Sequence, residues 1–343
     1  MRPKLPVAVF LAEPAASSIR TETDFCNIEP RKSDCRFAVQ IGIEMYKISG
    51  PRTFRSLLNH EPVIRCLGCY DVLSAKLIEQ AGLETVFVGG FGCSASYLAQ
   101  PDMNVLTLSN MADIARHVCN QVRIPVIVDG DTGHGDLHNV ERTIRIFEQI
   151  GAAGIMLEDQ TTPKRCGHFE GKRVIPTREM VLKIMAAREA RENNDLVIIA
   201  RTDALAVNGM DDAIDRARRY ADAGADVCYI EAPTTEEELA IIPEKVKHPL
   251  MINMLAGGRT PIKSVDELRQ LGYKIVLCSI DTVLAVAHTI QKLTHTLIEK
   301  GRLDGLANEM ITFQEMQVIT GLPEVLDIRS RLDRKLVQQE DKK

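Results

Sequence analysis

The chain of 343 residues contains no tryptophan, and only 4% of its residues are aromatic. It also lacks any apolar run of the roughly 18 residues that a membrane-spanning helix needs. Its formal net charge is −5, so it has no overall excess of the basic side chains that are typical of nucleic-acid-binding domains. We therefore expect a protein that neither spans a membrane nor binds nucleic acid.

The nine cysteines are an odd number, and most of them lie inside apolar runs such as VCYIEA and IVLCSI. Cysteine in such a run behaves as a small hydrophobic residue, and reduced thiols are typical of a cytoplasmic protein. Cys66 and Cys69 form a CxxC pattern that could be redox-active. Because no second pair completes a zinc site, we interpret them as buried thiols in and just after a strand.

The first part of the chain shows no sustained hydrophobic period, so we expect residues 1–50 to form a partly ordered arm. It begins MRPKLPVAVFLAEPAA, where a short apolar patch is interrupted by Pro6 and followed by Glu13. This patch only faintly resembles a targeting segment. We expect a cytoplasmic location, with the mitochondrion as the alternative.

Four segments share one pattern, in which a glycine precedes a short apolar run. They are QAGLETVFVGG, QIGAAGIMLEDQ, DAGADVCYIEAP and QLGYKIVLCSI. Glycine provides the left-handed conformation that ends many helices, and a strand buried on both faces reads as a short apolar run. Each segment therefore indicates a helix end that leads into a strand. Four further apolar runs lie before or between these segments: PVIRCL, IPVIVD, LVIIAR and HPLMIN.

These eight predicted strands alternate with stretches of helical spacing. Such alternation predicts an α/β fold of the (β/α)8 TIM barrel type, which we assign to residues 51–290. A doubly wound open sheet is the alternative. Residues 291–343 have amphipathic helical spacing and extend beyond one barrel helix, so we expect this C-terminal segment to pack on a neighbouring subunit.

Polar side chains follow the predicted strands at their C-terminal ends, where the active site of a (β/α)8 barrel lies. Asp129 and Asp131 follow one strand, and Glu158 ends the next. Because desolvating a carboxylate is costly, buried acids need a partner or a metal. Oxygen ligands of this kind suit Mg²⁺, with Mn²⁺ as an alternative. Later strands end in further polar residues that would face the same opening: Arg201, Asp203, Glu231 and Asn253.

Several neighbouring polar residues have a second interpretation. Asp159 and Asp203 could simply cap helices. His134 and His138 have the i, i+4 spacing of zinc ligands, but no acidic helix motif accompanies them, so we interpret them as solvated loop residues.

The stretch PKRCGHFEGK, at residues 163–172, places Cys166 among four cationic or titratable side chains, Lys164, Arg165, His168 and Lys172. It is too polar to be predicted as core. Nearby cations favour the thiolate, which suits Cys166 for proton transfer, and two glycines would let the loop close. We predict that this stretch, called the lid below, closes over a metal-bound anion. A solvated basic loop with an incidental cysteine is the alternative.

Taken together, these motifs resemble the isocitrate lyase / phosphoenolpyruvate mutase superfamily. KRCGH follows LEDQ, DGDTGHG precedes both, and ARTDA, IEAP and INM come later, so that the resemblance covers about residues 62–290. It implies a (β/α)8 barrel whose last helix is exchanged between the subunits of a homotetramer. It also implies a magnesium ion and a small di- or tricarboxylate substrate.

The resemblance further implies roles for individual residues. Cys166 corresponds to the catalytic acid/base, and His168, Arg201 and Glu231 would complete the catalytic group. Asp129 and Asp131 would hold the metal, with Glu158 and Asp102 acting through its waters. The residues expected to bind substrate are Gly89, Gly90, Phe91, Gly167, Arg201, Glu231, Asn253 and Ser279.

Three positions differ from the patterns of particular branches. Gly89 stands where the lyases usually have Ser or Thr, and Ala256 stands near the position where methylisocitrate lyases have Glu. Ser279 falls where methylisocitrate and dimethylmalate lyases tend to have Pro, which resembles the oxaloacetate hydrolase branch. GGRTP and DGDTGHG instead resemble dimethylmalate-type lyases, so the branch signals conflict.

We therefore expect a magnesium-dependent carbon–carbon lyase. It would cleave a substituted malate or (methyl)isocitrate-like 2-hydroxy acid into a 2-oxo acid and a smaller carboxylate. Hydrolysis of oxaloacetate to oxalate and acetate is the main alternative. Phosphonomutase-like chemistry or simple decarboxylation is a third possibility. Phosphonomutases of the superfamily typically lack the CGH lid, so its presence favours carbon–carbon cleavage over phosphoryl migration. A non-catalytic dicarboxylate-binding barrel and a thiol-redox protein built on Cys66 and Cys69 are the remaining alternatives.

Overall fold

The computed structural model describes residues 50–167 and 169–340. The arm expected over residues 1–50 lies outside these residues apart from Gly50. At the centre is a closed barrel in which eight parallel strands follow one another in chain order and β8 pairs with β1. The strands are β1 Ile64–Cys69, β2 Thr85–Val88, β3 Val126–Asp129, β4 Gly154–Glu158, β5 Val197–Thr202, β6 Val227–Ile230, β7 Leu250–Asn253 and β8 Ile275–Cys278.

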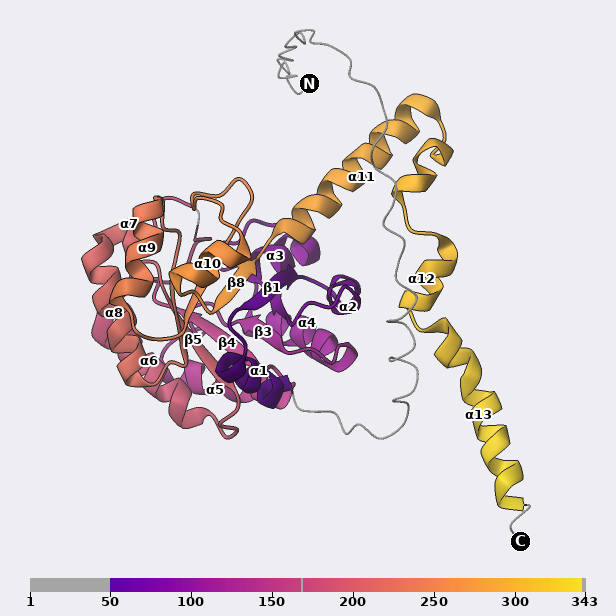
Figure 1. The fold of residues 1–343 in the computed structure, drawn as a ribbon, viewed down its shortest axis with the longest axis horizontal. Helices are drawn as coiled ribbons and strands as arrows, with labels where there is room; N and C mark the ends of the chain where they lie inside the picture. Colours follow the sequence, from indigo (N-terminus) through magenta and orange to yellow (C-terminus); the bar gives the residue numbers. More distant parts are fainter. Residues whose placement is uncertain (1–49, 168, 341–343) are drawn as a thin grey trace, which may run out of the picture. The chain divides into compact units, whose positions relative to one another are not determined.

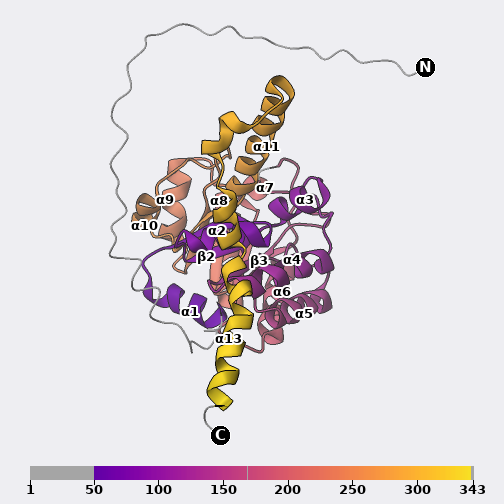
Figure 2. The ribbon, with the colours of Figure 1, turned by 90° about the vertical axis from the view of Figure 1, so that its right-hand side faces the viewer.

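Helices surround the barrel, as Figures 1 and 2 show from two directions. Each of the eight apolar runs identified in the sequence overlaps one of the strands, and helical segments alternate with them. The predicted (β/α)8 barrel is therefore confirmed, and the doubly wound open sheet is wrong. The helices between strands are α2 Val72–Gln80, α3 Gly90–Leu98, α4 Leu108–Gln121, α5 Leu137–Gln149, α6 Thr177–Ala190, α7 Leu205–Asn208, α8 Met210–Ala223, α9 Glu236–Lys245 and α10 Val265–Leu271.

Helix α1, Gly50–His60, closes the N-terminal end of the barrel. Its Phe54 side chain is fully buried and belongs to the same apolar cluster as barrel residues Ile64, Ile127 and Val197. The ring packs against Gly154 at the start of β4, where an added Cβ would lie 2.9 Å from Phe54 Cε1. With this end filled by side chains, the opposite end of the barrel, where the strands terminate, is the one that can accept a ligand.

The two thiols of the CxxC pattern lie in β1 and are both free and buried. Cys66 belongs to the cluster inside the barrel, whereas Cys69 belongs to the cluster between the strands and the surrounding helices. Successive side chains of a strand alternate between its faces, so the pair points in opposite directions. Burial raises the pKa of the Cys66 thiol to about 12. These features support structural thiols rather than a redox pair.

The C-terminal segment forms the helices predicted from its spacing. They are α11 Asp281–Lys300, a 3₁₀ helix Asp304–Glu309, α12 Phe313–Ile319 and α13 Leu322–Glu340. No residue of α11 is buried, and large apolar side chains such as Ile290, Ile298 and Phe313 are exposed. Among helices within the described residues, none combines the length and apolar character needed to cross a bilayer.

We expect Phe54→Ala to lower the free energy of unfolding by about 3–5 kcal/mol, the range for truncating a buried phenylalanine. Urea denaturation measures the change. The control Leu77→Ala truncates a side chain that is 40% exposed on α2 and should cost about 1 kcal/mol or less. Equal losses in the two variants would contradict a barrel closed by α1.

Candidate active site

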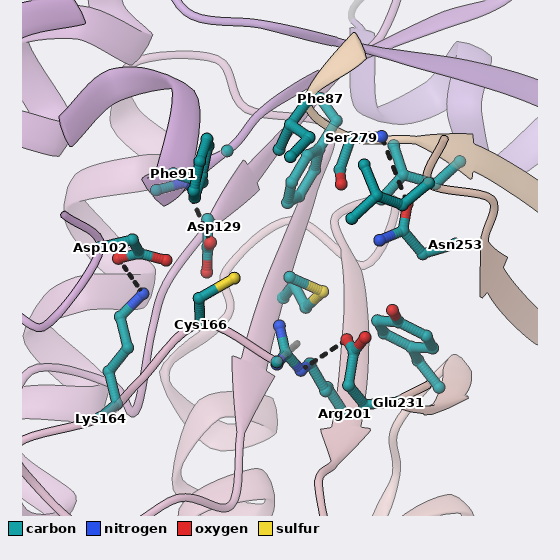
Figure 3. A pocket seen from close by; sticks show the side chains of 18 of the residues that line it. Phe87, Phe91, Asp102, Asp129, Lys164, Cys166, Arg201, Glu231, Asn253 and Ser279 are labelled. Atoms are coloured by element: carbon teal, nitrogen blue, oxygen red, sulfur yellow. Dashed lines mark hydrogen bonds and ion pairs between the residues drawn. The ribbon is translucent and has the colours of Figure 1, made fainter. Parts of the chain in front are cut away.

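A small cavity of about 50 Å³ lies at the C-terminal end of the barrel. Figure 3 shows the side chains that surround it, including Cys166 from the lid and Arg201 from β5. Most of the residues predicted to form the site line it: Gly89, Gly90, Phe91, Asp102, Asp129, Cys166, Gly167, Arg201, Glu231, Asn253 and Ser279. The predicted catalytic residue His168 lies outside the described residues.

Four buried carboxylates gather beside the cavity: Asp102, Asp129, Asp131 and Glu158. We call them the acidic cluster. The main-chain N–H groups of Asp131 and Gly90 donate to Asp129 Oδ1 and Oδ2 over 3.0 and 3.1 Å. Asp131 itself has a left-handed φ of +47°, which is uncommon outside glycine. The two amides therefore fix the orientation of the Asp129 carboxylate at the end of β3.

Lys164 supplies the cation that faces this cluster. Its Nζ lies 2.5 Å from Asp102 Oδ1 and 2.8 Å from Asp131 Oδ1. The side chain is only 3% exposed. Burial alone would lower the pKa of Lys164, but the surrounding carboxylates, Asp131 foremost, raise it well above its usual value. The ammonium therefore stays charged and partly neutralises the cluster.

The sequence prediction that the lid is too polar to be buried is wrong for both of its lysines. Lys164 and Lys172 are buried, and each pairs with a carboxylate of the barrel. Arg165 is exposed, and its Nη1 donates 2.9 Å to the Glu170 carbonyl. These three cations have other partners, so a ring of solvated cations around Cys166 does not describe the lid.

The acidic cluster has the chemistry of a hard-cation site. Within the described residues, Glu158 Oε1 is buried and accepts no hydrogen bond, whereas Asp131 Oδ1 has the Lys164 ammonium 2.8 Å away as its ion-pair partner. Unsatisfied buried carboxylate oxygens are costly, and all four cluster residues offer the oxygen ligands that Mg²⁺ prefers. In the described part of the chain no three acidic, His or Cys side chains already form a coordinating group, and the Lys164 ammonium is paired with both Asp102 and Asp131. The carboxylate oxygens of the acidic cluster therefore fit Mg²⁺. Lys164 would share the Asp102 and Asp131 carboxylates with the ion.

Arg201, at the end of β5, is held by carboxylates on several sides. Its Nε and Nη2 donate to the two Asp203 oxygens, each over 3.0 Å. Nε also lies 3.2 Å from Glu231 Oε2, and Nη1 lies 3.4 Å from Glu158 Oε2. The guanidinium carbon lies 5.7 Å from the centre of the Tyr229 ring, within the range of a cation–π contact. The guanidinium is therefore oriented before any ligand binds.

The lid is closed over Arg201 in this structure. Gln160 holds it near its start, since its side chain donates to the Arg165 carbonyl over 2.7 Å and accepts the Arg165 N–H over 3.0 Å. The Cys166 N–H donates 3.2 Å to the Asp102 carbonyl. At Gly167 an added Cβ would lie 2.4 Å from Arg201 Nη2 and 2.5 Å from Glu231 Cδ. Glycine is thus needed here for close approach, not only for the mobility inferred from the sequence.

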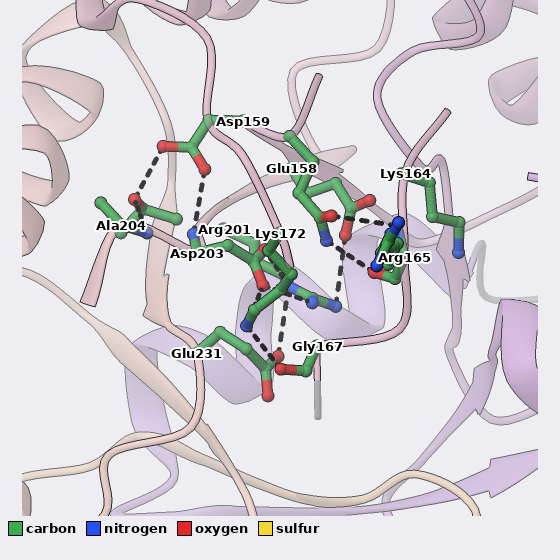
Figure 4. A network of polar contacts seen from close by, with 12 residues as sticks. Glu158, Asp159, Lys164, Arg165, Gly167, Lys172, Arg201, Asp203, Ala204 and Glu231 are labelled. Atoms are coloured by element: carbon green, nitrogen blue, oxygen red, sulfur yellow. Dashed lines mark hydrogen bonds and ion pairs between the residues drawn. The ribbon is translucent and has the colours of Figure 1, made fainter. Parts of the chain in front are cut away.

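Asp159 forms a buried network behind the site, and Figure 4 shows its contact with the Asp203 N–H together with the lid contacts. Its carboxylate accepts from Thr202 Oγ1, Tyr220 Oη and Arg216 Nη1 over 2.7, 2.8 and 3.1 Å. Neither Asp159 nor Asp203 caps a helix, since the Asp203 carboxylate pairs with Arg201 and Lys172 instead. Both acids hold the β4 and β5 ends in place.

The two histidines of the DTGHG region differ in exposure. His138 is exposed, as predicted, whereas His134 is half-buried. In the described residues its Nε2 has no hydrogen-bond partner, and burial lowers the pKa of His134. The interpretation of His134 as a solvated residue is therefore wrong.

The remaining wall of the cavity contains two of the unusual positions, Gly89 and Ser279. An added Cβ at Gly89 would lie 2.8 Å from Phe87 Cε1, so the Phe87 ring occupies the space of a side chain there. Asn253 Oδ1 accepts the Ser279 N–H over 3.2 Å. Gly68 allows this segment to approach β1, because a Cβ there would lie 1.8 Å from the Ser279 carbonyl oxygen.

Sequence reasoning did not identify Lys164, Gln160, Gly68, Phe87 or Tyr229 as parts of the site. The position of Lys164 could have indicated its role, since it lies two residues before Cys166 in a loop expected to face buried acids. The others are ordinary strand or loop residues whose contacts arise only in the folded chain.

A family model described as phosphoenolpyruvate phosphomutase matches residues 54–298. The 2,3-dimethylmalate lyase of Eubacterium barkeri is 38% identical over 274 residues, which cover 80% of this chain and 95% of the relative. The 2-methylisocitrate lyase of Aeropyrum pernix is 40% identical over 267 residues, covering 78% of this chain and 86% of the relative.

Two solved structures extend the comparison. Oxaloacetate acetylhydrolase in complex with 3,3-difluorooxalacetate superposes with a TM-score of 0.79 and 33% identity, covering 83% of this chain and 97% of that one. Phosphonopyruvate hydrolase in complex with oxalate and Mg²⁺ gives a TM-score of 0.75 and 28% identity, covering 84% and 99%.

We expect Lys164→Met to tighten Mg²⁺ binding, because the variant removes a buried positive charge from the acidic cluster. The Kd should fall at least about tenfold, equivalent to about 1.4 kcal/mol, by isothermal titration calorimetry. Lys247→Met is the matched control, since that lysine donates to the Pro243 carbonyl, 3.3 Å away, in another part of the barrel. Unchanged or weaker Mg²⁺ binding in the Lys164 variant alone would contradict this arrangement.

Proposed function

Because the chain belongs to the phosphoenolpyruvate mutase/isocitrate lyase superfamily, whose members include lyases similar to it, we propose that it is a magnesium-dependent carbon–carbon lyase. Its substrate would be a small substituted malate or (methyl)isocitrate-like 2-hydroxy acid. The products would be a 2-oxo acid and a smaller carboxylate. The observation that carries this proposal is the meeting of the lid thiol of Cys166 with Arg201 and the acidic cluster around one cavity.

Arg201 is the group suited to bind a substrate carboxylate. Its planar guanidinium matches a carboxylate in shape and charge, and its orientation is fixed by Asp203, Glu231 and the Tyr229 ring. Asn253 and Ser279 line the same cavity and offer polar groups for further oxygens. Pre-orientation of this kind avoids an entropic cost when the ligand binds.

The cleavage step requires one proton to leave and one to arrive. The substrate's 2-hydroxyl gives its proton to a carboxylate of the acidic cluster, the bond between C2 and C3 breaks, and its electron pair remains on C3. The Cys166 thiol then donates its proton to C3, and the cluster carboxylate returns its proton to the thiolate through solvent. The sum is substrate to 2-oxo acid plus carboxylate, with no external oxidant or reductant. The closed lid keeps water away from the C3 carbanion until it is protonated.

Asp129 and Asp131 would hold the Mg²⁺, with Glu158 and Asp102 oriented towards its waters; Mn²⁺ would bind the same oxygens. The bound ion supplies Lewis-acid polarisation of the substrate's oxygen at C2. The oxygen-rich cluster, in which Glu158 Oε1 accepts no hydrogen bond, supports this assignment, as does the oxalate and Mg²⁺ complex of phosphonopyruvate hydrolase.

Oxaloacetate hydrolysis to oxalate and acetate is the second candidate, and Ser279 is the observation that favours it. Ser279 lines the cavity beside Asn253, and oxaloacetate acetylhydrolase is among the similar solved structures.

We also propose a homotetramer in which the last barrel helix is exchanged between subunits. The lack of buried residues in α11 and the exposed apolar side chains of α11 to α13 support it. We further propose a cytoplasmic location, with the mitochondrion as the alternative, which suits cysteines that pack in the core as small hydrophobic residues.

A substrate panel tests the proposed reaction. Oxaloacetate, methylisocitrate, isocitrate and 2,3-dimethylmalate are each incubated with the protein and Mg²⁺, and the products are identified by mass. We expect cleavage of one 2-hydroxy acid into a 2-oxo acid and a carboxylate. Oxalate from oxaloacetate alone would establish the second candidate instead, and no product from any acid would refute both.

We expect Cys166→Ser to lower kcat by about 10²- to 10⁴-fold, the usual contribution of a general acid, because a serine hydroxyl is a far weaker acid than a thiol. Mg²⁺ and oxalate binding, measured calorimetrically, should stay near the wild-type values. Cys119→Ser changes another half-buried thiol, on α4, and should leave kcat unaltered. Wild-type turnover in the Cys166 variant would refute the role of the thiol.

For the second candidate, we expect Ser279→Pro to abolish oxalate release from oxaloacetate. Proline removes both the hydroxyl and the N–H that Asn253 accepts. Product mass after incubation with oxaloacetate and Mg²⁺ measures the effect, and continued oxalate release would show that Ser279 has no part in hydrolysis.

A further inference from the structure

Lys172 is a buried cation of the lid that the proposed chemistry does not use. Its side chain is 2% exposed. The ammonium donates to the Gly167 carbonyl over 2.5 Å and to Asp203 Oδ1 over 2.8 Å. Burying an ammonium is costly unless it is paired, so these two contacts account for its position inside the protein.

The two partners of Lys172 belong to different parts of the site. Gly167 is the lid residue next to Cys166, and its backbone lies against Arg201 and Glu231. Asp203 belongs to the barrel and accepts from both Arg201 Nε and Arg201 Nη2. Figure 4 shows Lys172 between them. One ammonium therefore joins the backbone that carries the thiol to the carboxylate that orients the guanidinium.

Asp203 is shared by two cations. Its Oδ1 accepts from Lys172 Nζ at 2.8 Å and from Arg201 Nη2 at 3.0 Å. Burial alone would raise the pKa of Asp203, but Arg201 and then Lys172 hold it below its usual value. Without Lys172, Arg201 would be the remaining charged partner of the Asp203 carboxylate. The carboxylate would then have no cationic partner from the lid.

Other contacts hold the lid, but they do not reach Arg201 in this way. Lys164 ties it to Asp102 and Asp131, and Gln160 holds Arg165. The Arg259–Glu170 pair lies 3.3 Å apart at the surface, where an ion pair contributes little. Lys172 is thus the lid cation whose partner also orients the carboxylate-binding group.

We propose that Lys172 is a positioning residue that couples closure of the lid over the cavity to the orientation of Arg201 through Asp203. Its consequence for catalysis rests on the proposed function, because Cys166 and Arg201 must act on one substrate. When the lid closes, the ammonium reaches Asp203, so the thiol and the oriented guanidinium are presented together. When the lid opens, Asp203 loses one of its two cations and Arg201 gains freedom.

Hydrogen exchange in the full-length protein, without metal or substrate, tests the lid contact directly. The reporters are the N–H groups of Arg165, Cys166 and Phe169, which donate to Gln160, Asp102 and Cys166 respectively. In Lys172→Met these amides should exchange at least about tenfold faster, as expected when a closed segment loses a charge-assisted hydrogen bond. Amides of the barrel strands should keep their wild-type rates. Lys247→Met is the control and should alter neither group.

The result that overturns the proposal is a wild-type exchange rate in the lid of folded Lys172→Met. If the Lys172→Met variant also loses protection across the barrel strands, Lys172→Gln is used in its place. Glutamine keeps a hydrogen-bond donor without the charge, and the exchange rate of the lid amides is again the measured quantity. Wild-type lid exchange in Lys172→Gln would then also overturn it.

The coupling to Arg201 is tested by a double-mutant cycle with Asp203→Asn on kcat/KM for the acid that the substrate panel identifies. If Lys172 acts through Asp203, the double variant should lose markedly less than the product of the single losses. Independent losses that multiply would overturn the coupling. The exchange measurement needs no turnover. If the substrate panel gives no product, the proposed reaction is refuted, but hydrogen exchange still tests the contact between Lys172 and the lid.

Discussion

The pairing of buried carboxylates with buried cations at the ends of the strands is the interaction on which the site depends. Lys164 faces the acidic cluster, and Lys172 and Arg201 share Asp203. Buried charges are tolerated when they are paired, and removing one partner leaves the other uncompensated. Two of these cations, Lys164 and Lys172, come from the lid, and Arg201 comes from the barrel. Closing the lid therefore also supplies the cations that pair with the buried carboxylates Asp102, Asp131 and Asp203. The proposed coupling of the lid to Arg201 rests on two of these ion pairs, those of Lys172 and Arg201 with Asp203.

This pairing also explains why the lid is rich in cations. Cations close to a thiol would lower its pKa, and that was the reason the sequence suggested. In the folded protein Lys164 and Lys172 instead face carboxylates of the barrel. Cys166 is left at the cavity wall beside Gly167, whose missing side chain lets the loop lie against Arg201. The ion pairs of Lys164 and Lys172 therefore hold the lid in place. The Cys166 thiol is left to face the cavity.

Much of the fold could be predicted from the sequence because its signals are local. A glycine followed by an apolar run marks a helix-to-strand transition, and eight such runs in alternation with helical spacing identify the barrel. Asp129, Glu158 and Arg201 could be assigned to the site because barrel topology brings the strand ends together. Gly68 could not be recognised, since its role depends on the Ser279 carbonyl more than two hundred residues away. The burial of Lys164 and His134 was missed for the same reason. The polar composition of their segments predicts solvent-exposed side chains, whereas the contacts that bury them form only in the folded chain.

The central claim is that the acidic cluster binds a divalent cation facing the lid thiol. Anomalous diffraction from crystals grown with Mn²⁺ and oxalate tests it most directly, because the signal locates the ion without reference to activity. We expect one anomalous peak within coordination distance of Asp129 or Asp131, with oxalate between the ion and Arg201 and with Cys166 on the facing side. A peak elsewhere, or an acidic cluster still filled by Lys164 alone at saturating Mn²⁺, would contradict it.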